Sequence, residues 1–217
     1  MIIESIQWSH PSTNILAGPS NSGKTTLISS ILEYKNTLFK QSNLKTILYF
    51  NQEQEIYTDW IKNGLVSYSS KGVPSIEDFT TIIKYHSNDD GAVVIFDDLG
   101  GEVLSNLAFF EHIFVVLSHH LKISVFLVLH HLFERGLRKI SLNTSRIILT
   151  LNQRDQTQIN YIGRQSFPGS RNFLSEVYNW IISHNDYGYI VLDFTQNRNH
   201  FLKVSTRWFS KSDSIRE

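Results

Sequence analysis

The chain has 217 residues, 41% of them hydrophobic, so it can bury one sizeable core and is expected to form a single domain. Its 20 basic and 20 acidic residues cancel, which argues against attachment to nucleic acid by bulk charge but leaves room for a local basic patch. No cysteine is present, which excludes disulfides and thiolate zinc sites. Without a signal-peptide pattern or a run of roughly 18 apolar residues, we expect a soluble, intracellular protein with no membrane partner.

Short apolar segments alternate with helical patterns along the chain. The expected strands are Thr13–Ala17, Thr46–Phe50, Ala92–Phe96, Ser124–Leu129, Arg146–Leu151 and Tyr189–Phe194, and the expected helices are Lys24–Tyr34, Ile76–Tyr85 and Val103–Leu121. Strands that are apolar throughout are buried on both faces, and their alternation with helices favours a parallel sheet. We therefore predict one α/β domain over residues 1–209, with a central, mainly parallel sheet and helices on both faces. A polar tail follows at 210–217.

One segment carries a specific phosphate-binding pattern. Gly18-Pro19-Ser20-Asn21-Ser22-Gly23-Lys24-Thr25 matches G-x-x-x-x-G-K-[ST] in full, follows an expected strand and opens an expected helix. The glycines let backbone N–H groups converge on a phosphate beside a helix N-terminus, whose dipole favours anions. Lys24 supplies a cation to the β- and γ-phosphates, and the Thr25 hydroxyl is a ligand for Mg²⁺. We therefore predict ATP binding at Gly18–Thr25.

A second acidic element follows the expected strand Ala92–Phe96. Asp97 is expected to orient the magnesium ion, through its water shell, and Asp98 to polarise the attacking water. A carboxylate poised on water indicates the additional-strand (RecA-like) class of P-loop enzymes rather than the kinase or GTPase class. Taken alone, two aspartates after a strand could equally form a turn or a helix cap.

Together these segments resemble the FtsK–HerA superfamily of DNA-pumping ATPases, and most of all the genome-packaging ATPases of poxvirus-like, adenovirus-like and Polinton-type double-stranded DNA viruses. The likeness spans most of the chain and rests on Gly18–Thr25, Ile95–Asp98, His130–Phe133, Gly136–Asn143, Ser145–Asp155, Arg164–Gly169 and Tyr187–Phe194. It implies an ATP-driven motor that moves double-stranded DNA without sequence specificity, as a homo-oligomeric ring of roughly five or six subunits. It also implies capsid vertex proteins as partners, in the nucleus or cytoplasm of a host cell.

The resemblance assigns roles to further residues. The superfamily places a polar sensor, often Gln, after the strand that follows the acidic pair, which here is His130, with His131 beside it. An arginine from a neighbouring subunit stabilises charge on the transferring phosphoryl group. Candidates are Arg135, Arg138, Arg146 and Arg154, of which we favour Arg138 and then Arg154. The histidines could instead cap a strand or pack beneath a loop, and most arginines lie in solvent or pair with acids. Asn152 is either a second sensor or, as we favour slightly, an ordinary strand-end turn.

DNA contacts are expected in three places. They are the polar loop at Lys71-Gly72, the pair Gly100-Gly101, and a basic C-terminal group of Arg198, Lys203, Arg207 and Lys211. A few charges per subunit suffice when several subunits surround one duplex, although each residue is also typical of a solvated surface. Other functions stay open, namely a replication-associated helicase or helicase loader and a slow nucleotide-gated switch or scaffold. A small-molecule kinase would need an arginine-rich lid, which we do not find.

Overall fold

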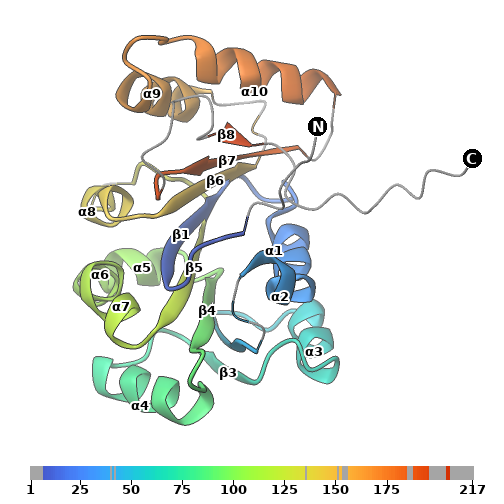
Figure 1. Ribbon diagram of the computed structural model, residues 1–217, viewed down its shortest axis with the longest axis vertical. Coiled ribbons are helices and arrows are strands. Elements are labelled where there is room, and N and C mark those ends of the chain that lie inside the picture. The colour runs from blue at the N-terminus through green and yellow to red at the C-terminus, as the bar shows by residue number, and fades with distance from the viewer. Residues whose placement is uncertain are drawn as a thin grey trace, which may run out of the picture.

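The computed structural model describes residues 7–39, 41, 43–134, 136–150, 152, 156–184, 188–195 and 204–205, and its centre is one eight-stranded sheet (Figure 1). The strands are β1 (Ser12–Ala17), β2 (Lys45–Phe50), β3 (Tyr68–Lys71), β4 (Ala92–Asp97), β5 (Ile123–Leu129), β6 (Arg146–Thr150), β7 (Tyr189–Asp193) and β8 (Val204–Ser205). Their spatial order is β3-β2-β4-β5-β1-β6-β7-β8. The first six in this order pair in parallel, whereas β7 and β8 are antiparallel additions. The predicted mainly parallel sheet is confirmed.

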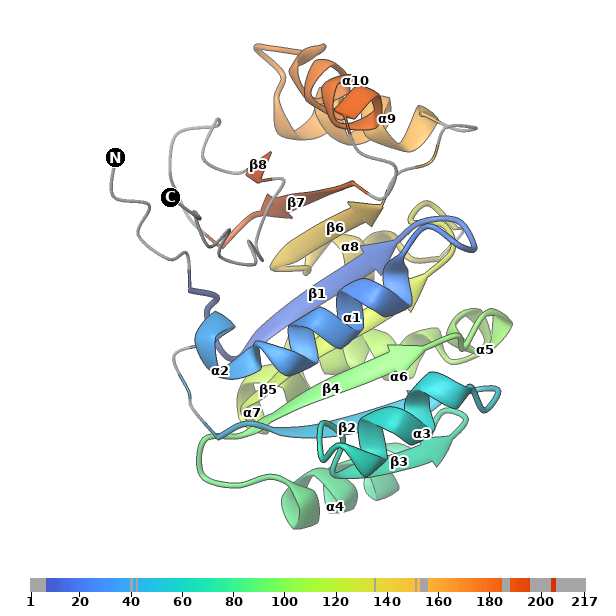
Figure 2. The same ribbon diagram turned by 90° about the vertical axis from the view of Figure 1, so that its right-hand side faces the viewer.

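Helices cover both faces of this sheet (Figures 1 and 2). One face carries α1 (Lys24–Glu33), α2 (Lys35–Leu38) and α3 (Glu55–Lys62); the other carries α4 (Ile76–His86), the helical segments after β4, and α8 (Arg138–Leu142). The pair α9 (Thr157–Ser166) and α10 (Phe173–His184) lies beyond β6 and β7. Successive strand residues point into two different cores, as Ile15 and Leu16 of β1 do, because side chains alternate along a strand. In the described part of the chain, no helix is both long and apolar enough to cross a membrane.

The prediction of one continuous helix over Val103–Leu121 is wrong, because the segment is divided into shorter helical pieces. The segment consists of α5 (Gly101–Ser105), α6 (Leu107–His112), a π-helical turn η1 (Ile113–Leu117) and α7 (Ser118–His120). Asn106 interrupts the helix with φ −120° and ψ 34°, and its side-chain amide donates to the carbonyl of Glu102 at 2.8 Å. Asparagine side chains compete with the backbone for such bonds, which is why this residue type breaks helices. The apolar spacing survives the break, so Phe110 and Phe114 still enter the core.

A buried ion pair joins the last two long strands of the sheet. Arg146 of β6 is 1% exposed, and its Nε lies 2.9 Å from Oδ2 of Asp193 on β7. The same guanidinium donates to Asn14 of β1 and to Ser9, and it lies 4.7 Å from the ring centroid of Trp8. Arg146 therefore ties the segment before β1 to the sheet. It cannot be the arginine that acts on a neighbouring subunit, since no part of it reaches the surface.

Candidate active site

The phosphate loop connects β1 to α1 and is already folded around its own groups. Asn21 and Gly23 adopt left-handed backbone conformations, with φ of 61° and 87°. The Lys24 ammonium donates to the carbonyls of Gly18 and Pro19, both at 2.8 Å. Burial lowers the pKa of Lys24, while the nearby carboxylates of the acidic pair oppose that shift. A phosphate arriving in this loop would therefore replace the two carbonyls as the partner of a buried cation.

A threonine at the end of β6 is hydrogen-bonded to the phosphate loop. Thr150 Oγ1 lies 2.6 Å from Ser22 Oγ, and Ser22 in turn donates to the Pro19 carbonyl at 2.8 Å. A Cβ atom on Gly18 would lie 1.8 Å from Thr150 Oγ1, so only glycine fits at the first position of the motif. The loop and β6 thus form one packed unit. Thr150 was missed in the sequence, although a polar residue at the end of an apolar strand was a usable signal.

The carboxyl ends of β1, β4 and β5 surround a cavity of about 250 Å³. Its lining includes Lys24 and Thr25, both aspartates of the acidic pair, and His130. In open α/β sheets this edge is the usual place for ligands. The hydroxyl of Thr25 and the carboxylate of Asp97 are hard oxygen donors of the kind that Mg²⁺ prefers, so the residues present fit a magnesium ion beside a nucleotide.

The two carboxylates lie in different environments. Asp97 is 4% exposed and accepts a hydrogen bond from the Tyr57 hydroxyl at 3.0 Å. Burial raises the pKa of Asp97; the Tyr57 hydrogen bond and Lys24 lower it, and the charge of Asp98 raises it. Asp98 is half-buried, and its φ of 54° is left-handed, which is uncommon outside glycine and typical of functional turns. The backbone thus turns sharply after Asp97 and leaves Asp98 accessible to water.

His130 directly follows β5 and lies beside the acidic pair. Its Nε2 lies 3.8 Å from Oδ1 of Asp98, beyond hydrogen-bond distance, and both side chains are partly exposed. The sequence placed His130 at the sensor position, and the structure brings it into the same cavity as Asp98; its sensor role stays a prediction. His131 points elsewhere, since it lines a separate surface cavity with Phe133 and Tyr161.

The remaining candidates are spread more widely. Arg138 is exposed at the start of α8 and does not line the cavity. Arg135 and Arg154 lie outside the described residues. Asn152 exchanges backbone hydrogen bonds with the Tyr178 hydroxyl of α10 and lines a small cavity of about 20 Å³ behind Gly18. Asn152 is thus held against α10 by its backbone, and it does not line the cavity of the acidic pair.

Of the residues expected to contact DNA, some lie in regular secondary structure and others lie outside the described residues. Lys71 is the last residue of β3 rather than part of a loop, because it pairs with Phe50 of β2. A Cβ atom on Gly72 would lie 3.6 Å from the Glu102 carboxylate, so the turn after β3 adjoins the first turn of α5. Gly101 begins α5. The basic residues Arg198, Lys203, Arg207 and Lys211 lie outside the described residues, as does the tail at 210–217.

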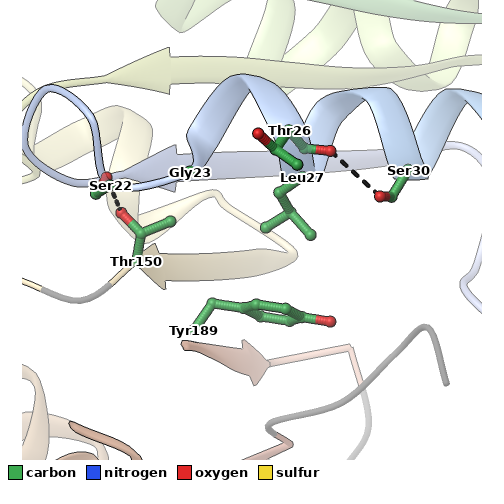
Figure 3. A pocket seen from close by; sticks show the side chains of 7 residues that line it. All are labelled: Ser22, Gly23, Thr26, Leu27, Ser30, Thr150 and Tyr189. Carbon is green, nitrogen blue, oxygen red and sulfur yellow. Dashed lines mark hydrogen bonds between the residues drawn. The ribbon is translucent and has the colours of Figure 1, made fainter. Parts of the chain in front are cut away.

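A second cavity, of about 390 Å³, opens on the α1 side of the phosphate loop (Figure 3). Thr26, Leu27 and Ser30 of α1 form one wall, and Tyr189 of β7 faces Leu27 across it. Thr150 and Ser22 close the end next to the loop, joined by the hydrogen bond described above. An aromatic ring, an aliphatic side chain and several hydroxyls suit a flat heterocycle joined to a sugar.

Several residues that line these cavities belong to no sequence motif, so they were not identified from the sequence. Gln54 and Glu134 line the cavity of the acidic pair, and Tyr57 binds Asp97 from behind. None of them belongs to a pattern, and each is brought in by the packing of α3 or by the loop after β5. Tyr189 was recognised only as part of a strand.

The strand that ends in the acidic pair, β4, is separated from the phosphate-loop strand β1 by β5. This extra strand, the loop and the paired aspartates define a P-loop NTPase of the additional-strand class. No protein-family model and no curated protein matches the sequence.

Solved structures share this fold. The genome packaging NTPase B204 from Sulfolobus turreted icosahedral virus 2 matches with a TM-score of 0.55 in complex with sulfate and 0.53 in complex with ATP-gammaS, at 12% identity. The match covers 90% of this chain and 95% or 96% of B204. The cytoplasmic domain of the Type VII secretion ATPase EccC from Thermomonospora curvata has a TM-score of 0.54, also at 12% identity, over 85% of this chain and 24% of that one. The fold of this chain is therefore shared with these solved structures.

Proposed function

We propose that this chain is an ATP-hydrolysing motor that translocates double-stranded DNA and packages a viral genome into a capsid. The observation that carries the ATPase part is the single cavity in which Lys24, Thr25, Asp97 and Asp98 converge. A nucleotide-gated switch would need the first three of these groups but has little use for a second, accessible carboxylate. The adjoining cavity beside Tyr189 would take the adenosine end of the same nucleotide.

The residues divide the chemistry among them. Lys24 leaves the carbonyls of the loop and holds phosphate oxygens. Thr25 and Asp97 would hold a magnesium ion, which when bound would neutralise charge on the phosphates. Asp98 accepts a proton from the attacking water as the water oxygen bonds to the γ-phosphorus and the bond to the β-phosphate oxygen breaks. His130, next to Asp98, positions that water or senses the γ-phosphate.

Support for the motor part comes from the fold. The likeness to the B204 genome packaging NTPase extends over 90% of this chain and 95% of B204. An exposed Arg138 outside the cavity suits a ring in which each subunit completes its neighbour's site. The turn after β3 adjoins the first turn of α5, which follows the acidic pair, so hydrolysis would move both against a DNA backbone.

The test is the ATPase rate as a function of protein concentration, with and without linear duplex DNA, for the wild type and Lys24→Ala. A rate per subunit that rises with concentration and with duplex, and is lost in the variant, is the expected result. A rate that needs Lys24 but is indifferent to concentration and DNA would retain the ATPase and refute the motor. Stimulation by single strands rather than duplex would favour a helicase-type ATPase.

A further inference from the structure

Helix α3 carries a tyrosine whose hydroxyl is buried against the acidic pair. Tyr57 is 2% exposed, and its Oη donates to Oδ2 of Asp97 at 3.0 Å. Its ring packs between Phe50 at the end of β2 and Trp60 one turn further along α3, with centroid distances of 5.1 and 5.3 Å. Since the ring is enclosed on two sides by other aromatics, the hydroxyl is held in one place.

The next turn of α3 reaches the other predicted magnesium ligand. Trp60 Nε1 donates to Ser29 Oγ at 2.9 Å, and Ser29 Oγ donates to the backbone carbonyl of Thr25 at 3.1 Å. Thus Tyr57 contacts Asp97 directly, while Trp60 supports the helical turn that presents Thr25. One short helix, outside every recognised motif, braces both residues that are expected to hold the ion.

We infer that Tyr57 is a positioning residue for the metal site, which fixes the Asp97 carboxylate in the orientation that binds magnesium. The inference rests on the proposed function, because it presumes a magnesium nucleotide in this cavity. When one oxygen of a carboxylate is fixed by a hydrogen bond, the other can bind a metal ion without a further loss of side-chain rotational entropy. Hydrogen-bond partners behind metal ligands typically change metal affinity by about 10- to 100-fold.

The Tyr57 hydroxyl is protonated, as a hydrogen-bond donor to Asp97 must be. Burial and the neighbouring Asp97 raise the pKa of Tyr57, so its hydroxyl remains a donor throughout the working pH range. Its hydrogen bond also opposes the effect of burial on Asp97 by lowering the pKa of that carboxyl group.

The test compares Tyr57→Phe with Tyr49→Phe in the full chain. Tyr49 is a matched control, because it is equally buried and its hydroxyl has no hydrogen-bond partner among the described residues. Both substitutions keep the ring and its packing, so both variants are expected to fold, which denaturation midpoints check. Binding of ATP-gammaS is measured by calorimetry at a series of Mg²⁺ concentrations and in EDTA.

For Tyr57→Phe we expect the Mg²⁺ concentration at half-maximal enhancement of nucleotide binding to rise about 10-fold or more. Its affinity in EDTA should stay within about twofold of the wild type, and Tyr49→Phe should match the wild type under both conditions. An unchanged magnesium requirement in Tyr57→Phe would overturn the inference, as would an equal loss with and without magnesium. If the wild type itself binds no nucleotide, the proposed function fails.

Discussion

The ion pair between Arg146 and Asp193 offers a direct test of how the sheet edge is stabilised. In Asp193→Leu, the guanidinium of Arg146 stays 1% exposed but loses its counter-charge. It keeps only its neutral partners, Asn14 and Ser9, and the ring of Trp8. Removing one member of a buried pair costs about 3–5 kcal/mol, because an uncompensated charge remains in a medium of low polarity. Burial already lowers the pKa of Arg146, and Asp193 is the group that opposes this shift.

Urea denaturation, followed by tryptophan fluorescence, measures this loss. With a slope of about 2–3 kcal/mol per molar urea, a destabilisation of about 4 kcal/mol moves the midpoint down by about 1.3–2 M. Trp8, which lies against the guanidinium, reports the local change. The double variant Arg146→Met with Asp193→Leu removes both charges and should recover most of the lost stability. A single variant that costs less than about 1 kcal/mol, or a double variant no better than the single one, would refute the reasoning.

Three further substitutions test the active site. Gly18→Ala should abolish nucleotide binding, because its Cβ would displace the Thr150 hydroxyl, and Thr150→Ala in the same chain should partly restore binding; failure of that rescue would contradict the packing argument. Asp98→Asn should retain ATP binding and lower the hydrolysis rate by about 10²- to 10⁴-fold, whereas a rate near wild type would remove Asp98 from its role. Arg138→Ala should lose about 10³-fold or more in rate without losing stability. Mixing it with Asp98→Asn should restore activity if Arg138 acts between subunits; no recovery would contradict that role, and an unchanged rate in Arg138→Ala would point to another arginine.

The phosphate site could be predicted from the sequence because its chemistry fixes residue types at fixed spacing. A backbone that wraps a phosphate needs glycines, a lysine and a hydroxyl in one order, and Gly18–Thr25 lies between a strand and a helix, as the pattern predicted. The apolar strands were equally visible, since each is buried on both faces. β3 was missed because Tyr68–Lys71 is a partly exposed edge strand with no apolar run.

Other features depend on packing between distant segments. Nothing near Tyr57 in the sequence indicates Asp97, which lies 40 residues further on, and only the placement of α3 joins them. The break at Asn106 leaves the helical apolar spacing intact, so periodicity cannot detect it. The burial of Arg146 was also hidden, because an arginine at the start of a strand is usually exposed, and its partner is supplied by β7.

The central position of β1 has a consequence for biosynthesis. Its partner strands are β5 and β6, so Ser12 meets Ser124 and Asn14 meets Arg146, at separations of 112 and 132 residues. Ser22 cannot form its hydrogen bond with Thr150 until 128 more residues have been synthesised. At about 5–20 residues per second, a ribosome needs roughly 6–26 s to make that stretch. During this time the phosphate loop lacks its contact with Thr150, and long-range pairing of this kind also slows folding. The first functional element to be synthesised is therefore completed only when two-thirds of the chain has been made.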